Sequence, residues 1–331
     1  MNLKRGFITI LIFICIGETM LRFDEHFHLF EDNRVVKSLT DISITMEYNM
    51  LINNTFPTDT NSFRVMVLGD SYISGAGLKI TDNFSSQLKA ILKSSNKKFD
   101  SIFVFDAGVP KNNNLDNNET YFKYVDKFRP NIIVLGYNYN DVMDNLYKKD
   151  MVAIPENVSG VKIRSSQEVE ESKLRRLLLL AYNSKFVRYL HSKLYVQFKQ
   201  HGIIFPGSEF DVMMKSYSQN TERWIISKRL LKEWIDDSKE RKIKTIVLQC
   251  PQTDLMQYPH LFKGADSAIQ QFFKSFSTVE YKPICEILKG TDPTEYLLSK
   301  YDGHSNAKAH RKIAETVYAL IKASPSFKNR F

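Results

Sequence analysis

Two short segments far apart in this chain contain the residue types that nucleophilic catalysis needs. The first is a Gly-Asp-Ser segment that ends at Ser71 and follows an apolar run over 64–68. The second places Asp302 two residues before His304, just ahead of an amphipathic stretch over 307–322. Serine is a weak nucleophile at its own pKa and is usually activated by a histidine that a carboxylate orients. We therefore take Ser71 as candidate nucleophile, His304 as candidate base and Asp302 as candidate orienting acid.

Two further positions carry hydrogen-bond donors that suit a developing oxyanion. Gly108 follows an apolar run over 101–105, and a glycine lets its backbone N–H approach a ligand closely. Asn140 follows another run over 131–135 and carries a side-chain amide. Together with the N–H of Ser71 these groups form a candidate oxyanion hole, in which one donor typically contributes about 2.7–4 kcal/mol. Taken alone, an asparagine such as Asn140 is more often an ordinary loop residue than an oxyanion donor.

The apolar runs alternate with stretches of helical periodicity. We expect strands over 64–68, 101–105, 131–135 and 242–248, and helices over 84–92, 220–241 and 307–322. Strands that alternate with helices predict an α/β fold with a parallel sheet covered on both faces. The carboxyl ends of such strands meet at one edge of the sheet, where open α/β sheets form their sites. We expect the candidate nucleophile and oxyanion donors to meet there.

In this order, the four segments resemble the SGNH (GDSL) hydrolase superfamily. The resemblance covers about 64–140 and 243–323, and it implies a flavodoxin-like three-layer α/β/α sandwich with a central parallel sheet. It also implies a serine nucleophile, an oxyanion hole built by the first three blocks, and an acid and a base from the last block. These roles fall on Ser71, Gly108, Asn140, Asp302 and His304.

The sequence departs from the family pattern at two places. Asn138 stands where the third block usually has glycine, and this affects the expected backbone path before Asn140. A single residue separates Asp302 from His304, where the family commonly has two, and this affects the orienting role of the acid. His310, six residues beyond His304, is the alternative base.

The first 22 residues have the pattern of an export signal. Lys4 and Arg5 precede an apolar run over 7–16, which is short for a bilayer span of about 20 residues but suits the core of a signal peptide. We expect either a signal peptide cleaved after Gly17 or a retained N-terminal membrane anchor, with the rest of the chain outside the cytoplasm. The alternative is a buried N-terminal helix.

The remaining chain is expected to form one domain. A polar leading segment covers 23–62, and a single SGNH-hydrolase-like domain covers 63–325 with a helical insertion at about 142–241. We expect the insertion to cover the site and to set the size of the substrate. Its basic and apolar stretch over 174–199 is expected to be a helix, which suits contact with a membrane surface, although such helices more often pack on the sheet.

The composition narrows the classes of partner and cofactor. The 331 residues are 43% hydrophobic and 25% charged, which excludes a disordered chain and a multi-span membrane protein. The net charge of +9 is dispersed and no nucleic-acid motif accompanies it, so no nucleic-acid partner is expected. The seven histidines show no metal-ligand spacing, and neither a metal nor an organic cofactor is expected. Cys250 and Cys285 are expected to be buried free thiols rather than a disulfide.

These observations favour an exported serine esterase that hydrolyses O-acyl esters, expected to be acetyl esters, on a cell-envelope glycan or lipid. An O-acetyltransferase acting on a surface polysaccharide is the nearest alternative, because it differs only in what accepts the acyl group. A non-catalytic glycan-binding protein that retains the fold is a second alternative. A phosphate-binding protein is disfavoured, because no phosphate-cradling glycine-rich loop is present.

Overall fold

The computed structural model describes most of the chain from residue 61 onward and little of what precedes it. The described residues are 14–20, 61–143, 184, 186–187, 194, 197–198, 201–250, 252–290, 292–299, 302–327 and 331. The chain divides into two compact units, one of 1–37 with 154–203 and one of 38–153 with 204–331. The expected leading segment is almost entirely outside the described residues, as is most of the basic stretch over 174–199.

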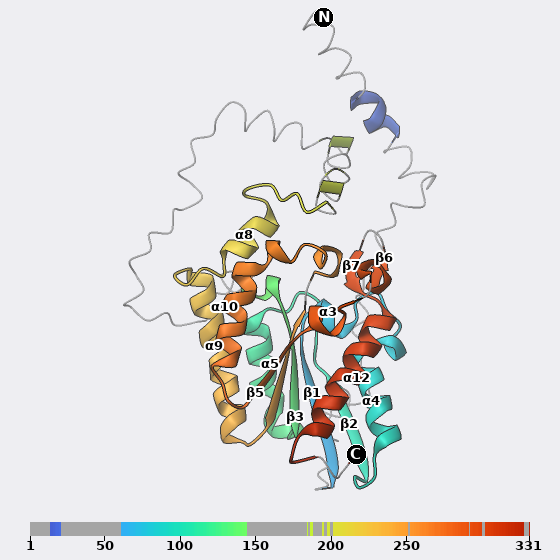
Figure 1. The fold of residues 1–331 in the computed structure, drawn as a ribbon, viewed down its shortest axis with the longest axis vertical. Coiled ribbons are helices and arrows are strands. Elements are labelled where there is room, and N and C mark those ends of the chain that lie inside the picture. The colour runs from blue at the N-terminus through green and yellow to red at the C-terminus, as the bar shows by residue number, and fades with distance from the viewer. Residues whose placement is uncertain are drawn as a thin grey trace, which may run out of the picture. The chain divides into compact units, whose positions relative to one another are not determined.

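The larger unit is built on a five-stranded parallel sheet with the strand order β2-β1-β3-β4-β5 (Figure 1). Its strands are β1 (Ser62–Gly69), β2 (Ser101–Asp106), β3 (Ile132–Asn138), β4 (Lys244–Cys250) and β5 (Val279–Pro283). The four strands expected from the apolar runs are confirmed, each with slightly different ends. The strand β5 was not expected, because its sequence VEYKP has no apolar run and all of its residues are half-buried.

Helices cover both faces of this sheet and enclose a hydrophobic core on each side. The helices α5 (Asn114–Phe128), α9 (Glu222–Glu240) and α10 (Lys263–Lys274) cover one face, and α4 (Phe84–Ser95) and α12 (Ala307–Ala323) cover the other (Figure 1). Alternate residues of β1 enter different cores, as a strand requires: Met66 and Leu68 enter one, Val65 and Val67 the other. The chain therefore has the expected three-layer α/β/α fold.

Short elements complete the larger unit. The α-helices are α3 (Ser71–Ser74), α8 (Glu209–Lys215) and α11 (Ile284–Ile287). The 3₁₀ turns are η2 (Ile80–Asp82), η3 (Tyr139–Val142), η6 (Thr253–Leu255), η7 (Pro259–Leu261) and η8 (Pro293–Tyr296). A separate antiparallel hairpin is formed by β6 (Leu297–Ser299) and β7 (Asp302–Ser305), and β7 carries two of the candidate catalytic residues.

The last part of the expected insertion belongs to the helix layer of the sandwich. The amide of Asn118 in α5 donates to Leu230 O in α9 at 3.0 Å, and the rings of Tyr121 and Trp234 lie 5.7 Å apart. Trp234 is fully buried. Because α9 connects β3 to β4 and packs on the sheet, it is the crossover helix of a parallel sheet.

The smaller unit contains a helix over 14–20 that contacts the segment around residue 186. The Glu18 carboxylate accepts hydrogen bonds from Ser184 Oγ at 2.9 Å and from Phe186 N–H at 3.0 Å. A Cβ added to Gly17 would lie 2.3 Å from the ring of Phe186, so the two residues are in close contact. In the part of the chain that the structure describes, no helix is both long enough and apolar enough to span a bilayer.

The two cysteines of the larger unit are not joined. Cys250 is buried and free, as expected. Cys285 is also free but exposed, which corrects the expectation that it would be buried. Its position directly after the edge strand β5, at the start of α11, explains the exposure.

Candidate active site

Two glycines, Gly69 in β1 and Gly136 in β3, leave room for the short helix α3 to pack directly on these strands. A Cβ at Gly136, in β3, would lie 2.5 Å from Ile73 Cβ. A Cβ at Gly69, the last residue of β1, would lie 2.6 Å from Ile73 Cγ2, and Gly69 has a φ of 141° that side chains disfavour. The Gly69 N–H is held by Asn117 Oδ1 at 3.0 Å. Ser71, the first residue of α3, is thereby fixed at the carboxyl edge of the sheet.

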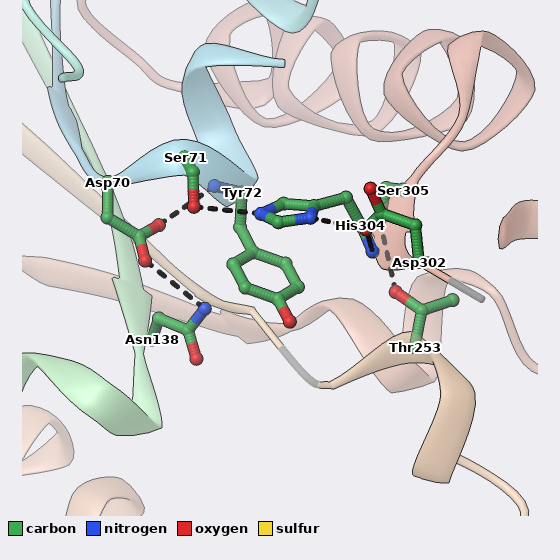
Figure 2. A network of polar contacts seen from close by, with 8 residues as sticks. All are labelled: Asp70, Ser71, Tyr72, Asn138, Thr253, Asp302, His304 and Ser305. Atoms are coloured by element: carbon green, nitrogen blue, oxygen red, sulfur yellow. Dashed lines mark hydrogen bonds and ion pairs between the residues drawn. The ribbon is translucent and has the colours of Figure 1, made fainter. Parts of the chain in front are cut away.

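The three candidate catalytic residues form one chain of hydrogen bonds (Figure 2). The distance from Ser71 Oγ to His304 Nε2 is 2.9 Å, and the distance from His304 Nδ1 to Asp302 Oδ1 is 2.6 Å. The side chains of His304 and Asp302 are 26% and 30% exposed, so a substrate can reach the imidazole. This is the order of contacts in which a carboxylate orients a base and the base contacts a nucleophile.

The short spacing between acid and base is explained by the strand β7. Residues two apart in a strand project to the same side, so Asp302 and His304 meet without the extra residue that the family commonly has. The His304 N–H also donates to Asp302 Oδ1 at 3.0 Å. The contact between Ser305 Oγ and Thr253 Oγ1, at 3.2 Å, ties this strand to the turn after β4. The hydrogen bond from the His304 side chain lowers the pKa of Asp302, so its carboxyl stays ionised at neutral pH.

Asp70 lies directly before the nucleophile and is fully buried. Burial raises the pKa of its carboxyl to about 6, and hydrogen bonds from Tyr72 N–H and from the side chains of Asn140 and Asn138 offset part of that rise. The Tyr72 N–H bond is 2.9 Å long and caps α3. Asp70 therefore connects the nucleophile turn to the polar residues after β3.

The structure brings both expected oxyanion donors to the nucleophile turn. Asn140 contacts the carboxylate of Asp70, the residue before Ser71. A Cβ at Gly108 would lie 3.3 Å from the side chains of Ile73 and Ser74, so this glycine borders α3. Its N–H donates to Asp106 Oδ1 at 3.2 Å.

Asn138, at the first departure from the family pattern, has two contacts in this site. Its side-chain oxygen accepts from Tyr139 N–H at 2.6 Å and caps the turn η3, which holds Asn140. Its amide donates to Asp70 Oδ2 at 3.4 Å (Figure 2). An asparagine here thus supports the path of the third block.

Tyr72 is a site residue that the sequence argument missed. Its ring stacks on the imidazole of His304, with ring centroids 4.5 Å apart and an angle of 30° between the planes (Figure 2). Burial raises the pKa of its phenol well above the ordinary value, so the ring stays neutral. The only signal in the sequence was its position directly after Ser71.

His310, the alternative base, has a structural role instead. It is 1% exposed, and its Nδ1 accepts the N–H of Phe84 at 2.9 Å, at the start of α4. Burial, with a smaller effect from the charge of His304, lowers the pKa of His310 to about 4. The imidazole is therefore neutral, enclosed and engaged with the backbone, which argues against its being the base.

Among the described residues, no group of three or more histidine, cysteine, aspartate or glutamate side chains is arranged to hold a metal ion.

The comparisons with known proteins found distant structural likenesses. No family model and no curated protein matches this sequence. An acetylxylan esterase from Geobacillus stearothermophilus is 10% identical over 78% of this chain and 93% of its own, with a TM-score of 0.46. A lipase/acylhydrolase from Enterococcus faecalis is 12% identical over 78% and 95%, with a TM-score of 0.45. The psychrotrophic esterase EstA from Pseudoalteromonas sp. is 12% identical over 78% and 96%, with a TM-score of 0.43.

With TM-scores below 0.5 and identities of 10–12%, the likeness is remote. The functional conclusion therefore rests on the contacts within this chain, from Ser71 through His304 to Asp302.

Proposed function

We propose that this protein is a serine ester hydrolase of the SGNH type. The observation that carries the proposal is the continuous hydrogen-bonded chain from Ser71 Oγ through His304 to Asp302, half-exposed at the edge of a parallel sheet. A binding protein that only retained the fold would have no need for this alignment, and a surface histidine rarely has a carboxylate on one nitrogen and a serine on the other.

The geometry supports a two-step acyl transfer. Ser71 Oγ attacks the ester carbonyl carbon while its proton passes to His304 Nε2, and Asp302 holds the opposite nitrogen. The imidazolium then protonates the alcohol oxygen as the C–O bond breaks, which leaves an acyl-serine. Water, deprotonated by His304, attacks that acyl group and releases the acid and the free serine.

The oxyanion of each tetrahedral intermediate is stabilised by hydrogen-bond donors around the turn that carries Ser71. The N–H groups of Ser71 and Gly108 and the amide of Asn140 are the proposed donors. The Gly108 N–H contacts Asp106 at 3.2 Å, a long bond, and it must turn from that carboxylate toward the substrate oxygen during the reaction.

For the substrate, we infer an acetyl or other short O-acyl ester on a glycan or lipid of the cell envelope. The resemblance to exported SGNH enzymes, the export-type pattern of Lys4, Arg5 and the run over 7–16, and the net charge of +9 support this inference. Transfer of the acyl group to a sugar hydroxyl would use the same first step. Radiolabelled acetyl that appears on an added glycan acceptor would identify a transferase, whereas free acetate alone identifies a hydrolase.

For location, we infer an exported protein that keeps its N-terminal segment as a membrane anchor. The contacts of Glu18 with Ser184 and Phe186, and of Gly17 with Phe186, support retention, because cleavage after Gly17 would remove part of the helix that makes them. The intact mass of protein purified from its native membranes tests this point. A mature chain that begins at Glu18 would overturn it.

The esterase proposal is tested with the full chain in detergent. Wild-type protein should react with a fluorophosphonate probe and hydrolyse p-nitrophenyl acetate, and Ser71→Ala should abolish both. Ser74→Ala, which removes another hydroxyl from the same helix α3, is the matched control and should retain both. The Ser71→Ala/His304→Ala double variant should be no slower than either single variant, because residues that act as a unit are not additive. Turnover that persists in Ser71→Ala would refute the proposal.

A further inference from the structure

The imidazole of His304 is held at both of its edges and on one of its faces. The hydrogen bonds to Ser71 and Asp302 fix a line through the two ring nitrogens. Those two bonds leave the ring able to tilt about that line. The stack with Tyr72, at 4.5 Å and 30°, covers one face of the imidazole and limits the tilt.

Tyr72 is itself anchored to the nucleophile turn. It follows Ser71 directly in the helix α3, and its N–H donates to Asp70 Oδ1 at 2.9 Å. The base of the reaction is therefore packed against the side chain of the residue that follows the nucleophile, although 233 residues separate His304 from Ser71 in the sequence. A shift of α3 would move the nucleophile and the ring stacked on the base together.

We propose that Tyr72 is a positioning residue that keeps the imidazole of His304 in plane with Ser71 Oγ and stabilises the imidazolium formed during the reaction. This inference rests on the proposed esterase function. A cation within about 6 Å of the centroid of an aromatic ring is attracted to the electron-rich face of that ring. The neutral imidazole gains less from that face than the imidazolium does, so the stack lowers the barrier rather than only strengthening the ground state.

The hydroxyl of Tyr72 is not required for this role. The ring is half-buried and the pKa of its phenol is raised well above the ordinary value, so the group remains neutral and the effect depends on the aromatic face. A phenylalanine at the same position keeps the face, and a leucine keeps the apolar volume but loses it. The two substitutions therefore separate a positioning role from simple packing.

The experiment measures kcat and KM of the full chain with p-nitrophenyl acetate. We expect Tyr72→Leu to lower kcat about 10-fold with KM changed less than about twofold, and Tyr72→Phe to restore kcat to near the wild-type value. Tyr258→Leu is the matched control, because Tyr258 contacts His260 edge to face at 6.2 Å. This variant should retain wild-type kcat. Equal kcat in Tyr72→Leu and wild type, or an equal loss in Tyr72→Phe and Tyr72→Leu, would overturn the proposal.

A second measurement does not depend on turnover. The hydrogen-bonded Nδ1 proton of His304 should give a downfield proton NMR signal that is present in wild type and Tyr72→Phe and is broadened or lost in Tyr72→Leu. The midpoint temperatures of thermal unfolding should agree within a few degrees for wild type, Tyr72→Phe and Tyr72→Leu. A signal unchanged in a folded Tyr72→Leu protein would overturn the positioning role even if the esterase proposal held. Wild-type protein that shows the expected signals but no turnover would instead refute the esterase function.

Discussion

His304 and His310 lie six residues apart, yet the fold gives the two imidazoles opposite properties. His304 is in β7, is 26% exposed, and has a carboxylate on one nitrogen and a serine hydroxyl on the other. His310 is in α12, is 1% exposed, and accepts a backbone N–H from Phe84. In this protein the chemistry open to a histidine depends on the element that carries the ring and on the groups that contact its two nitrogens.

The surroundings of His304 and of His310 suit the two imidazoles to different roles. An imidazole whose Nδ1 contacts a carboxylate and whose Nε2 contacts a hydroxyl can accept a proton from that hydroxyl and return it. An enclosed imidazole, whose pKa is lowered to about 4 by burial, stays neutral and serves as a hydrogen-bond acceptor for the start of α4. We therefore expect substitutions of the two histidines to affect different measured quantities.

The largest expected effect is on turnover by the His304→Ala variant. Without the base, hydrolysis of p-nitrophenyl acetate should fall about 10⁴-fold or more, while the free energy of unfolding stays within about 1 kcal/mol of wild type. His310→Gln should lower kcat only a few-fold. Steady-state kinetics and urea unfolding of both variants check these expectations. If His310→Gln were the inactive variant, the assignment of the two rings would be reversed.

The second largest effect is expected from a substitution of Asp302, the carboxylate that contacts His304. Asp302→Asn keeps the size of the side chain but removes the charge that holds His304 Nδ1–H, and kcat should fall roughly 10²- to 10⁴-fold. The activity lost should return in part at alkaline pH, where the serine hydroxyl depends less on an oriented base. Asp292→Asn, at an exposed carboxylate that caps the turn η8, is a control that should keep wild-type kcat. Wild-type kcat in Asp302→Asn would reduce the site to a dyad of Ser71 and His304.

Much of this fold and part of the site could be predicted from the sequence. Central parallel strands are buried on both faces, so they read as continuous apolar runs, as in β1 and β3. The residue types around Ser71 and His304 indicated a candidate nucleophile and a candidate base, and the structure places Ser71 Oγ 2.9 Å from His304 Nε2. The same reasoning missed β5 and β7, because neither segment has an apolar run.

The buried asparagines of α5 and the stack of Tyr72 on His304 could not be predicted, because both depend on contacts between distant segments of the chain. The helix α5 contains three buried asparagines, residue types that favour turns and caps over helix interiors. Each side chain has a hydrogen-bond partner outside the helix: Asn117 Oδ1 accepts from Gly69 N–H, Asn114 Nδ2 donates to Ser227 Oγ, and Asn118 Nδ2 donates to Leu230 O. The stack of Tyr72 on His304 is of the same kind, because it joins residues from the two ends of the domain. Contacts with residues that are distant in the sequence determine the environment of such side chains, and a single sequence does not reveal those contacts.

The smallest expected effect is a pair of opposite pH dependences, which extends the comparison to Asp70. The pKa of Asp70 is raised from 3.8 to about 6, so between these values the folded protein binds more protons than the unfolded chain. This contribution to stability is present in acid and is lost as the pH rises through 6. The pKa of His310 is lowered from 6.5 to about 4, so its contribution is present above 6.5 and is lost as the pH falls toward 4.

Because the two windows overlap, the two contributions largely cancel in the wild-type protein between pH 4 and 6. Each of the two pKa changes corresponds to about 3 kcal/mol. Asp70→Asn removes the aspartate contribution, so its free energy of unfolding should rise with pH relative to wild type, whereas His310→Gln removes the histidine contribution, so its free energy of unfolding should fall with pH relative to wild type. Urea unfolding at pH 4, 5 and 6 measures these slopes. Slopes of the same sign in the two variants would mean that burial does not separate the two groups as the fold indicates. Opposite slopes would show that burial holds both the Asp70 carboxyl, next to Ser71, and the His310 imidazole, which accepts the Phe84 N–H, in their uncharged forms.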